Sequence, residues 1–235
     1  MSDTAPLGVA APYNRVMNQK LFESRRDRLR DATVVGIFRM KAPEHVVEAA
    51  GAAVRGGFEA VEVTLNTPGA TDALAELAGR VDALVGAGTI VHVDQVKEAY
   101  DSGAEFIVTP VGVPDVVEAA HSLSLPIAVG ASTPTEVWNA REAGADWVKV
   151  FPAESLGGPS YIESLLGPLD GTPILVSGGI TAENYLGYLD VGVQIIGIGA
   201  PVFDPLIAAA GDYPELERRA IEVMRRFDLY QTDHG

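Results

Sequence analysis

Short runs of apolar residues recur along the chain and alternate with amphipathic segments. There are eight such runs: TVVGIF (33–38), AVEVTL (60–65), ALVGAG (83–88), FIVTP (106–110), PIAVGA (126–131), WVKVF (147–151), PILVSGG (173–179) and QIIGIG (194–199). Short apolar runs rich in β-branched residues are typical of strands that are buried on both faces of a parallel sheet. The pattern therefore predicts eight parallel strands.

Most intervals between these runs carry a helical pattern that ends at a glycine, the usual C-terminal stop of a helix. Examples are residues 43–57, 93–103, 134–144 and 181–192. Strands that alternate with helices indicate βα units. Eight such units predict a (β/α)8 barrel, with a doubly wound open sheet as the alternative.

Two further helical patterns lie outside the eight units. Residues 14–31 predict an extra N-terminal helix, and residues 213–230 predict a C-terminal helix. No linker or low-complexity segment interrupts the repeat. We therefore expect an N-terminal extension with its helix at residues 1–31 and a single barrel domain at residues 32–235.

The repeat can be aligned with itself, and this places two charged residues at one position. Four units run from a glycine directly into the second, fourth, sixth and eighth strands, at residues 57–62, 103–108, 144–149 and 192–197. Glu62 and Lys149 occupy the last position of their units. Alternate strands of a barrel contribute side chains to a common interior layer. The alignment therefore predicts that Glu62 and Lys149 point into the barrel and approach each other.

A lysine inside a barrel suggests covalent chemistry. Burial away from solvent disfavours the charged form of Lys149 and so favours its neutral amine, which can attack a ketone to form a Schiff base. Glu62 is placed to transfer the protons that such a reaction requires. A nearby carboxylate favours the ammonium form instead, so the two effects oppose each other. The alternative is a structural ion pair buried in the barrel.

Glycine-rich loops follow the last two predicted strands. Gly178 and Gly179 offer backbone N–H groups, and Thr181 can cap the following helix. Loops after strands seven and eight of a barrel often bind phosphate. Glycines are also common in tight turns, so the loops alone leave phosphate binding open.

Other polar residues end the earlier strands and are expected on the same rim. Arg39 follows the first strand and could hold a carboxylate in a bidentate manner, or it could form a surface ion pair. Thr89 ends the third strand, with a helix cap as its alternative role. Asn66 and Pro110 follow the second and fourth strands.

Composition excludes several classes of function. The 235 residues include 32 acidic and 17 basic ones, a formal net charge of −15, which disfavours nucleic acid or an anionic membrane as a partner. Cysteine is absent, so neither disulfides nor thiolate chemistry is expected. The histidines, at positions 45, 92, 121 and 234, show no metal-site spacing, and we expect no cofactor. No secretory pattern or apolar span is apparent, which predicts a cytoplasmic protein.

Five motifs in order, EVTLNTP, VGAGT, IVTP, VKVFPAESLGG and SGGITAENY, resemble the KDPG/KHG aldolase family of class I pyruvate aldolases. The resemblance covers roughly residues 32–205. It implies a (β/α)8 barrel, a homotrimer, and metal-free cleavage of 2-keto-3-deoxy-6-phosphogluconate into pyruvate and glyceraldehyde 3-phosphate. The partners implied are thus a sugar-acid substrate and pyruvate.

The resemblance also implies roles for individual residues. These are the Schiff-base lysine (Lys149), the general acid/base (Glu62), groups around the pyruvate carboxylate (Arg39 and Thr89), the pyruvate pocket (Pro110 and Phe151), and the phosphate loop (Ser177, Gly178 and Gly179).

Two departures from the family pattern concern the distal end of the substrate. Asn66 stands where the gluconate enzymes commonly have arginine. At this position the chain resembles the galactonate branch of the family. Ala200 stands where a phosphate-binding serine is expected. The identity of the sugar acid and the need for its phosphate therefore stay open, and unphosphorylated 2-keto-3-deoxy or 4-hydroxy-2-oxo acids are alternatives. The same residues would also fit a phosphosugar isomerase or epimerase with Glu62 as base, or a sugar-phosphate sensor without turnover.

Overall fold

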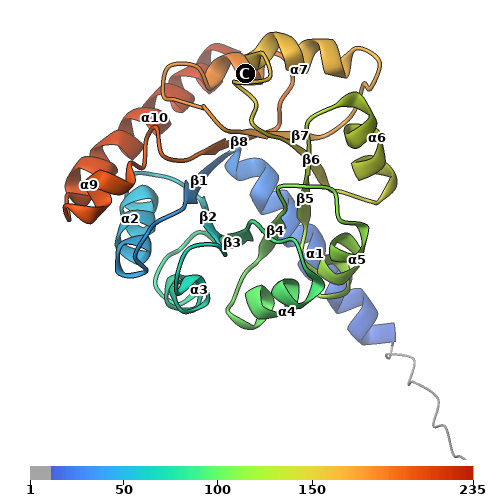
Figure 1. Cartoon of the computed structure of the whole chain (residues 1–235), viewed down its shortest axis with the longest axis horizontal. Helices are drawn as coiled ribbons and strands as arrows, with labels where there is room; N and C mark the ends of the chain where they lie inside the picture. Colours follow the sequence, from blue (N-terminus) through green and yellow to red (C-terminus); the bar gives the residue numbers. More distant parts are fainter. Residues whose placement is uncertain (1–11, 235) are drawn as a thin grey trace, which may run out of the picture.

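The eight strands form a closed parallel barrel in sequence order (Figure 1). The computed structural model describes residues 12–234, with side chains from residue 18 onward. The strands are β1 Val34–Phe38, β2 Ala60–Thr64, β3 Leu84–Gly88, β4 Phe106–Val108, β5 Ile127–Ala131, β6 Trp147–Val150, β7 Ile174–Ser177 and β8 Ile195–Ile198. Val34 of β1 pairs with Ile196 of β8 and closes the barrel. All eight predicted strands are confirmed, and the open-sheet alternative is wrong.

Helices surround the barrel because each strand turns alternate side chains outward. Val61 and Val63 of β2, for example, lie in the apolar core between the strands and the outer helices. The helices are α2 Glu44–Arg55, α3 Ala70–Ala78, α4 Val93–Asp101, α5 Pro114–Ser122, α6 Pro134–Glu142, α7 Gly158–Leu166, α8 Leu186–Asp190, α9 Pro205–Ala209 and α10 Tyr213–His234.

Helix α8 is shorter than the pattern over residues 181–192 predicts. The Thr181 hydroxyl accepts hydrogen bonds from the N–H groups of Glu183 and Asn184. These bonds hold residues 182–185 in a turn, and the helix begins only at Leu186. Thr181 thus orders the turn before the helix, but the N-cap of α8 is Tyr185, so the expectation that Thr181 caps this helix is wrong.

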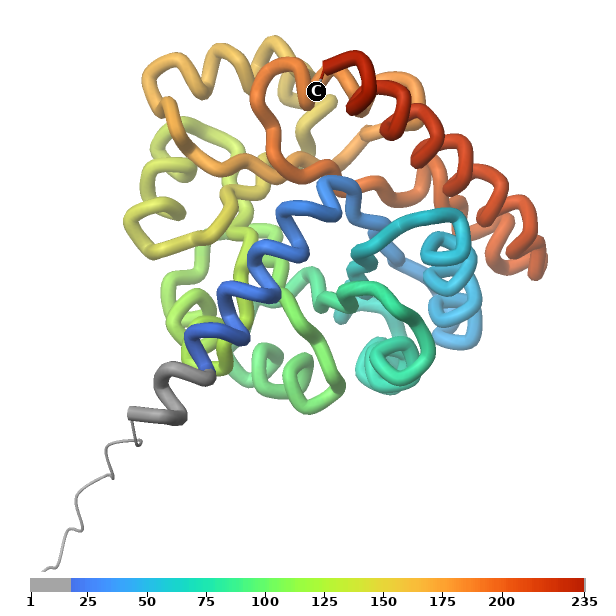
Figure 2. Tube along the Cα trace, turned by 180° about the vertical axis from the view of Figure 1, so that it is seen from behind, coloured from blue at the N-terminus to red at the C-terminus, as the bar shows by residue number. Residues whose placement is uncertain are grey.

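Helix α1, Pro12–Ala32, confirms the predicted N-terminal helix and lies across the N-terminal end of the barrel (Figure 2). Leu29 and Ala32 of α1 are buried in one cluster with the inward side chains of the strands, among them Phe106 and Trp147. Apolar packing therefore seals this end. The first eleven residues of the predicted extension lie outside the described residues.

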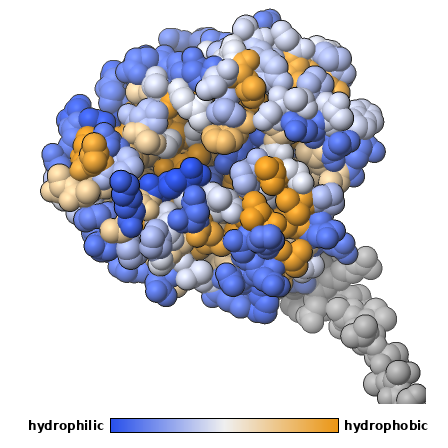
Figure 3. Space-filling view, viewed as in Figure 1, coloured by the Kyte–Doolittle hydropathy of each residue, from blue (hydrophilic) through white to orange (hydrophobic). Residues whose placement is uncertain are grey.

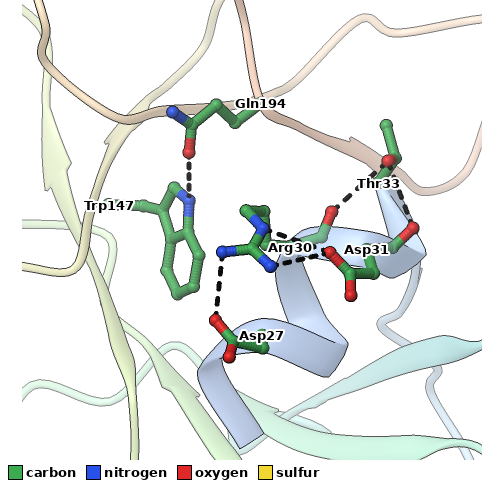
Figure 4. Close-up of polar contacts among 6 residues, drawn as sticks. All are labelled: Asp27, Arg30, Asp31, Thr33, Trp147 and Gln194. Carbon is green, nitrogen blue, oxygen red and sulfur yellow. Dashed lines mark hydrogen bonds and ion pairs between the residues drawn. The ribbon is translucent and has the colours of Figure 1, made fainter. Parts of the chain in front are cut away.

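Polar contacts surround this seal (Figure 4). The Trp147 indole N–H donates to Gln194 Oε1 at 3.0 Å. Arg30, near the end of α1, pairs with Asp27 and Asp31, each at 3.0 Å. Exposed ion pairs contribute little stability, so the apolar cluster is the main reason that α1 stays in place.

Candidate active site

A cavity of about 230 Å³ opens at the end of the barrel opposite to α1. Figure 3 views this end, where the surface is hollowed near its centre. Strands β1, β2, β6, β7 and β8, with the loops that follow them, supply the lining. The sequence-predicted residues that line it are Arg39, Glu62, Lys149, Phe151, Ser177, Gly178, Gly179 and Ala200.

Lys149 and Glu62 meet at the base of this cavity. Lys149 Nζ lies 3.9 Å from Glu62 Oε1, and the two side chains are only 9% and 2% exposed. Each follows the inward alternation of its strand, above Trp147 in β6 and Ala60 in β2. The predicted approach of these two residues inside the barrel is confirmed.

Glycines at inward positions make room for Glu62 and for other side chains of the barrel interior. A Cβ atom at Gly88 of β3 would overlap the Glu62 carboxylate. At Gly197 of β8, which shares the repeat position of Lys149, a Cβ would lie 2.8 Å from Ile37 Cδ1. This function of the glycines was not recognised from the sequence, although their inward register could have indicated it.

The environment of Glu62 favours proton transfer. Burial raises the pKa of Glu62, and the nearby cations Lys149 and Arg39 only partly oppose this effect. Within the described part of the chain, Glu62 Oε1 is buried without a hydrogen-bond partner. An unsatisfied buried acceptor is costly and calls for an explanation, of which a catalytic role is one.

Arg39 lines the cavity and contacts Thr89, which is not itself among the lining residues. The Arg39 guanidinium donates to Thr89 Oγ1 at 3.4 Å, and among the side chains described no carboxylate lies within ion-pair distance of Arg39. Thr89 adopts a positive φ of 62° at the end of β3. Helix α4 begins only at Val93, after His92, so the helix-cap alternative for Thr89 is wrong.

Phe151 borders the cavity on the side of Lys149. Its ring centroid lies 5.8 Å from Lys149 Nζ, within the range of a cation–π contact. The ring is partly open to solvent, and the Phe151 carbonyl accepts a hydrogen bond from the Ser132 hydroxyl. This position fits a side chain that covers a substrate bound at the lysine.

Besides Thr89, two predicted residues lie outside the lining of this cavity. Pro110 lines a second cavity, of about 430 Å³, between α5 and α6, although its backbone also packs closely against Gly130 of β5. Asn66 is exposed and lines neither of the two cavities. The structure therefore does not bring Pro110 or Asn66 into the lining around Lys149.

The loops after β7 and β8 form the outer wall of the cavity. Gly178 and Gly179 have φ values of 90° and 79°, a backbone conformation that favours glycine. The N–H groups of Gly178, Gly179 and Ala200 donate no hydrogen bond to any described residue. With the buried Ser177 hydroxyl, they provide a set of donors suited to an anion.

Several lining residues were not identified from sequence. These are Ile37, Ile180, Gly199, Pro201, Phe203 and Pro205. For Ile37 a signal existed, because it lies two positions from the inward Val35 in β1. The others belong to loops or, for Pro205, to the start of α9, where the strand alternation gives no direction.

No group of three metal-binding side chains occurs among residues 18–234. His45 instead bonds the Tyr213 hydroxyl, and His121 bonds Asp146. The helices that the structure describes include none with the length and apolar character needed to cross a membrane.

Comparisons with known proteins agree with this geometry. The family model described as KDPG and KHG aldolase matches residues 26–219. The KHG/KDPG aldolase of Escherichia coli K12 is 35% identical over 81% of this chain and 90% of its own length. The 2-dehydro-3-deoxy-6-phosphogalactonate aldolase of the same strain is 32% identical over 72% of this chain and 84% of its own.

Among solved structures, the KDPG aldolase of Legionella pneumophila, with pyruvate captured as a covalent carbinolamine, has a TM-score of 0.78 and 25% identity. The match covers 85% of this chain and 97% of that one. Sequence, fold and the pattern of the barrel interior lead to one conclusion: the chain belongs to the KDPG and KHG aldolase family.

Proposed function

We propose that this protein is a class I aldolase that cleaves a 2-keto-3-deoxy-6-phospho sugar acid, of gluconate or galactonate type, into pyruvate and glyceraldehyde 3-phosphate. One observation carries the proposal, namely the buried contact of 3.9 Å between Lys149 and Glu62 inside the cavity. The names of the relatives support the substrate class.

In the proposed reaction, Lys149 Nζ attacks the C2 carbonyl of the substrate, and loss of water gives a protonated imine. Glu62 accepts the proton of the C4 hydroxyl as the C3–C4 bond breaks, and the bonding electrons move into the imine to form an enamine. The aldehyde leaves. Proton return to C3 gives the pyruvate imine, which water hydrolyses to pyruvate and free lysine.

Other groups of the cavity would orient the substrate. Arg39, with Thr89 beside it, is placed to bind the carboxylate next to the reacting ketone. Phe151 would cover the imine. Pro110 does not line the cavity, but its backbone packs against Gly130, the register partner of Lys149, so it would support the pocket from behind the lining. Ser177, Gly178 and Gly179 would hold the distal phosphate through their donors.

Trapping of the imine tests the reaction class directly. Pyruvate with sodium borohydride should add a single reduced pyruvyl group to the protein, and peptide mass spectrometry should locate it at Lys149. A phosphosugar isomerase that uses Glu62 as base, or a sensor without turnover, would give no adduct. An adduct at Lys20, Lys41 or Lys97 would contradict the assignment.

We expect the preference for a phosphorylated substrate to be weaker than in gluconate-specific relatives, because Ala200 offers no hydroxyl at the phosphate end of the cavity. Ala200→Ser should raise the ratio of kcat/KM for phosphorylated over unphosphorylated substrate by about tenfold or more, since a hydrogen bond to a charged group contributes roughly 1.5–3 kcal/mol.

Steady-state assays with both epimers at C4, each with and without phosphate, measure this preference. Ala210→Ser, at an exposed site outside the cavity, is the matched control. A wild-type preference above about a thousandfold, some 4 kcal/mol, for the phosphorylated gluconate epimer would mean that other residues supply the missing contacts.

We also propose a homotrimer, as the family resemblance implies. An apolar surface supports association, because Val111 and Trp138 are each 50% exposed beside the cavity between α5 and α6. Multi-angle light scattering should give three times the 24.7 kDa chain mass. If this surface forms the interface, Trp138→Glu should reduce the mass, whereas Leu229→Glu, on the distant helix α10, should leave it unchanged. A wild-type monomer would overturn the proposal.

The remaining expectations stay predictions. The net charge of −15 supports the absence of a nucleic-acid or anionic-membrane partner, because both require a cationic surface. A cytoplasmic location fits a substrate of central carbohydrate metabolism, and cell fractionation would test it.

A further inference from the structure

A polar network connects the loop after the lysine strand with the glycine loop after β7. Glu154 follows Lys149 by five positions, between β6 and α7. Its Oε2 atom accepts hydrogen bonds from Asn184 Nδ2 at 3.1 Å and from the Tyr188 hydroxyl at 2.8 Å. One carboxylate oxygen thus joins the segment after β6 to the segment after β7, behind the cavity-lining Gly179.

Asn184 transmits this contact to the glycine loop. Its Nδ2 also donates to the Gly179 carbonyl at 3.1 Å, and its Oδ1 accepts from the Thr181 N–H at 2.8 Å. An amide side chain has donors on one side and an acceptor on the other. Because Glu154 accepts a hydrogen bond from Asn184 Nδ2, it fixes the orientation of the Asn184 amide. In this orientation the amide bonds both the Gly179 carbonyl and the Thr181 N–H.

Tyr188 provides a rigid second support. Its side chain is fully buried. Burial, and then the hydrogen bond to Glu154, raise the pKa of Tyr188, so its hydroxyl keeps its proton and remains a donor. The carboxylate is therefore anchored to α8 as well as to Asn184.

The backbone of the glycine loop also rests directly on the Glu154 segment. The Glu154 N–H donates to the Gly178 carbonyl at 3.1 Å. A Cβ atom at Gly179 would lie 2.5 Å from Glu154 Cβ. The position of Glu154 thus limits where the N–H groups of the loop can lie.

We propose that Glu154 is a positioning residue that acts through Asn184 and Tyr188 to hold the Gly178–Gly179 loop in the conformation that binds the distal phosphate of the substrate. The proposal rests on the proposed aldolase function and adds a specificity determinant to it. Charge alone predicts the opposite effect, because a carboxylate near a phosphate repels it.

The direction in which phosphate preference changes when Glu154 is replaced therefore distinguishes a positioning role from a charge effect. Glu154→Ala should lower the ratio of kcat/KM for phosphorylated over unphosphorylated substrate by about tenfold, through KM of the phosphorylated substrate, as expected for the loss of one or two hydrogen bonds. Glu154→Gln keeps an acceptor oxygen and removes the charge, so it should retain or raise the ratio.

Glu183→Ala is the matched control. Glu183 lies beside Asn184 in the segment after β7, is exposed, and its carboxylate makes no hydrogen bond with the described residues. The variant should keep the wild-type ratio. If Glu154→Ala does not fold, Asn184→Ala carries the same test, because it breaks the network without removing the carboxylate.

Three outcomes would overturn the proposal. A ratio that rises in Glu154→Ala would assign the carboxylate an electrostatic effect only. Equal losses for both substrates would assign it a general structural role, and the same loss in Glu183→Ala would point to surface charge. Borohydride trapping of pyruvate on the wild type separates these results from a failure of the aldolase function, which would leave no adduct at all.

Discussion

Replacement of Lys149 by alanine is expected to abolish both the borohydride-trapped pyruvate adduct and the cleavage of sugar acid. The reason is chemical, because Lys149 Nζ is the amine buried beside the Glu62 carboxylate at the base of the cavity. Without a nucleophile no imine forms, and the C3–C4 bond has no electron sink. We expect turnover to fall by roughly 10⁴-fold or more.

Two variants serve as controls. Lys149→Arg keeps a positive charge but cannot form a stable imine, so it should be as inactive as the alanine variant. Lys97→Ala removes an exposed lysine that pairs with Asp101 on α4 and should retain full activity. Cleavage or adduct formation that persists in Lys149→Ala would place the imine on another amine.

Glu62→Gln should lower kcat by about 10²–10⁴-fold, the usual contribution of a positioned acid/base group. The amide keeps the shape of the side chain beside Gly88 but cannot carry a proton. The pyruvate adduct should still form on Lys149, only more slowly, because the nucleophile is unchanged. Rapid-quench measurements of adduct formation and steady-state kcat separate the two effects.

The pH profile gives a second measure of Glu62. Burial raises the pKa of this carboxyl group. As the base in cleavage it must be deprotonated, so the rate should fall as the pH drops through this raised pKa, above the usual value of about 4.3. Glu62→Gln should lack this limb, whereas Glu59→Gln, at an exposed site before β2, should retain it. Near-wild-type kcat in Glu62→Gln would make another group or water the proton carrier.

The contact between Lys149 and Glu62 could be predicted from the sequence because the geometry of a closed barrel determines where the side chains of its strands point. Strand alternation fixes which side chains point inward, and the repeat fixes their layer. Glu62 pairs in register with Gly86, and Lys149 with Gly130, so small residues flank both. Strand alternation could have indicated that these glycines point inward, but which glycine lies beside which side chain depends on the register between neighbouring strands.

The rim was harder to predict for a physical reason. Loop residues have no periodicity, so neither the exposure of Asn66 nor the place of Pro110 between α5 and α6 follows from a pattern. The contacts of Glu154 with Asn184 and Tyr188 join positions 30 and 34 residues apart through side chains alone. Such contacts require the three-dimensional path of both loops.

The seal that α1 forms beneath the strands makes the interior a well with a closed floor. Lys149 lies near that floor, whereas Gly179 stands exposed at the rim. A molecule attached to the lysine therefore lies below whatever occupies the glycine loop. In the proposed reaction we therefore expect the two fragments to leave in a fixed sequence, because the aldehyde lies toward the opening whereas pyruvate stays bound to Lys149 until its imine is hydrolysed.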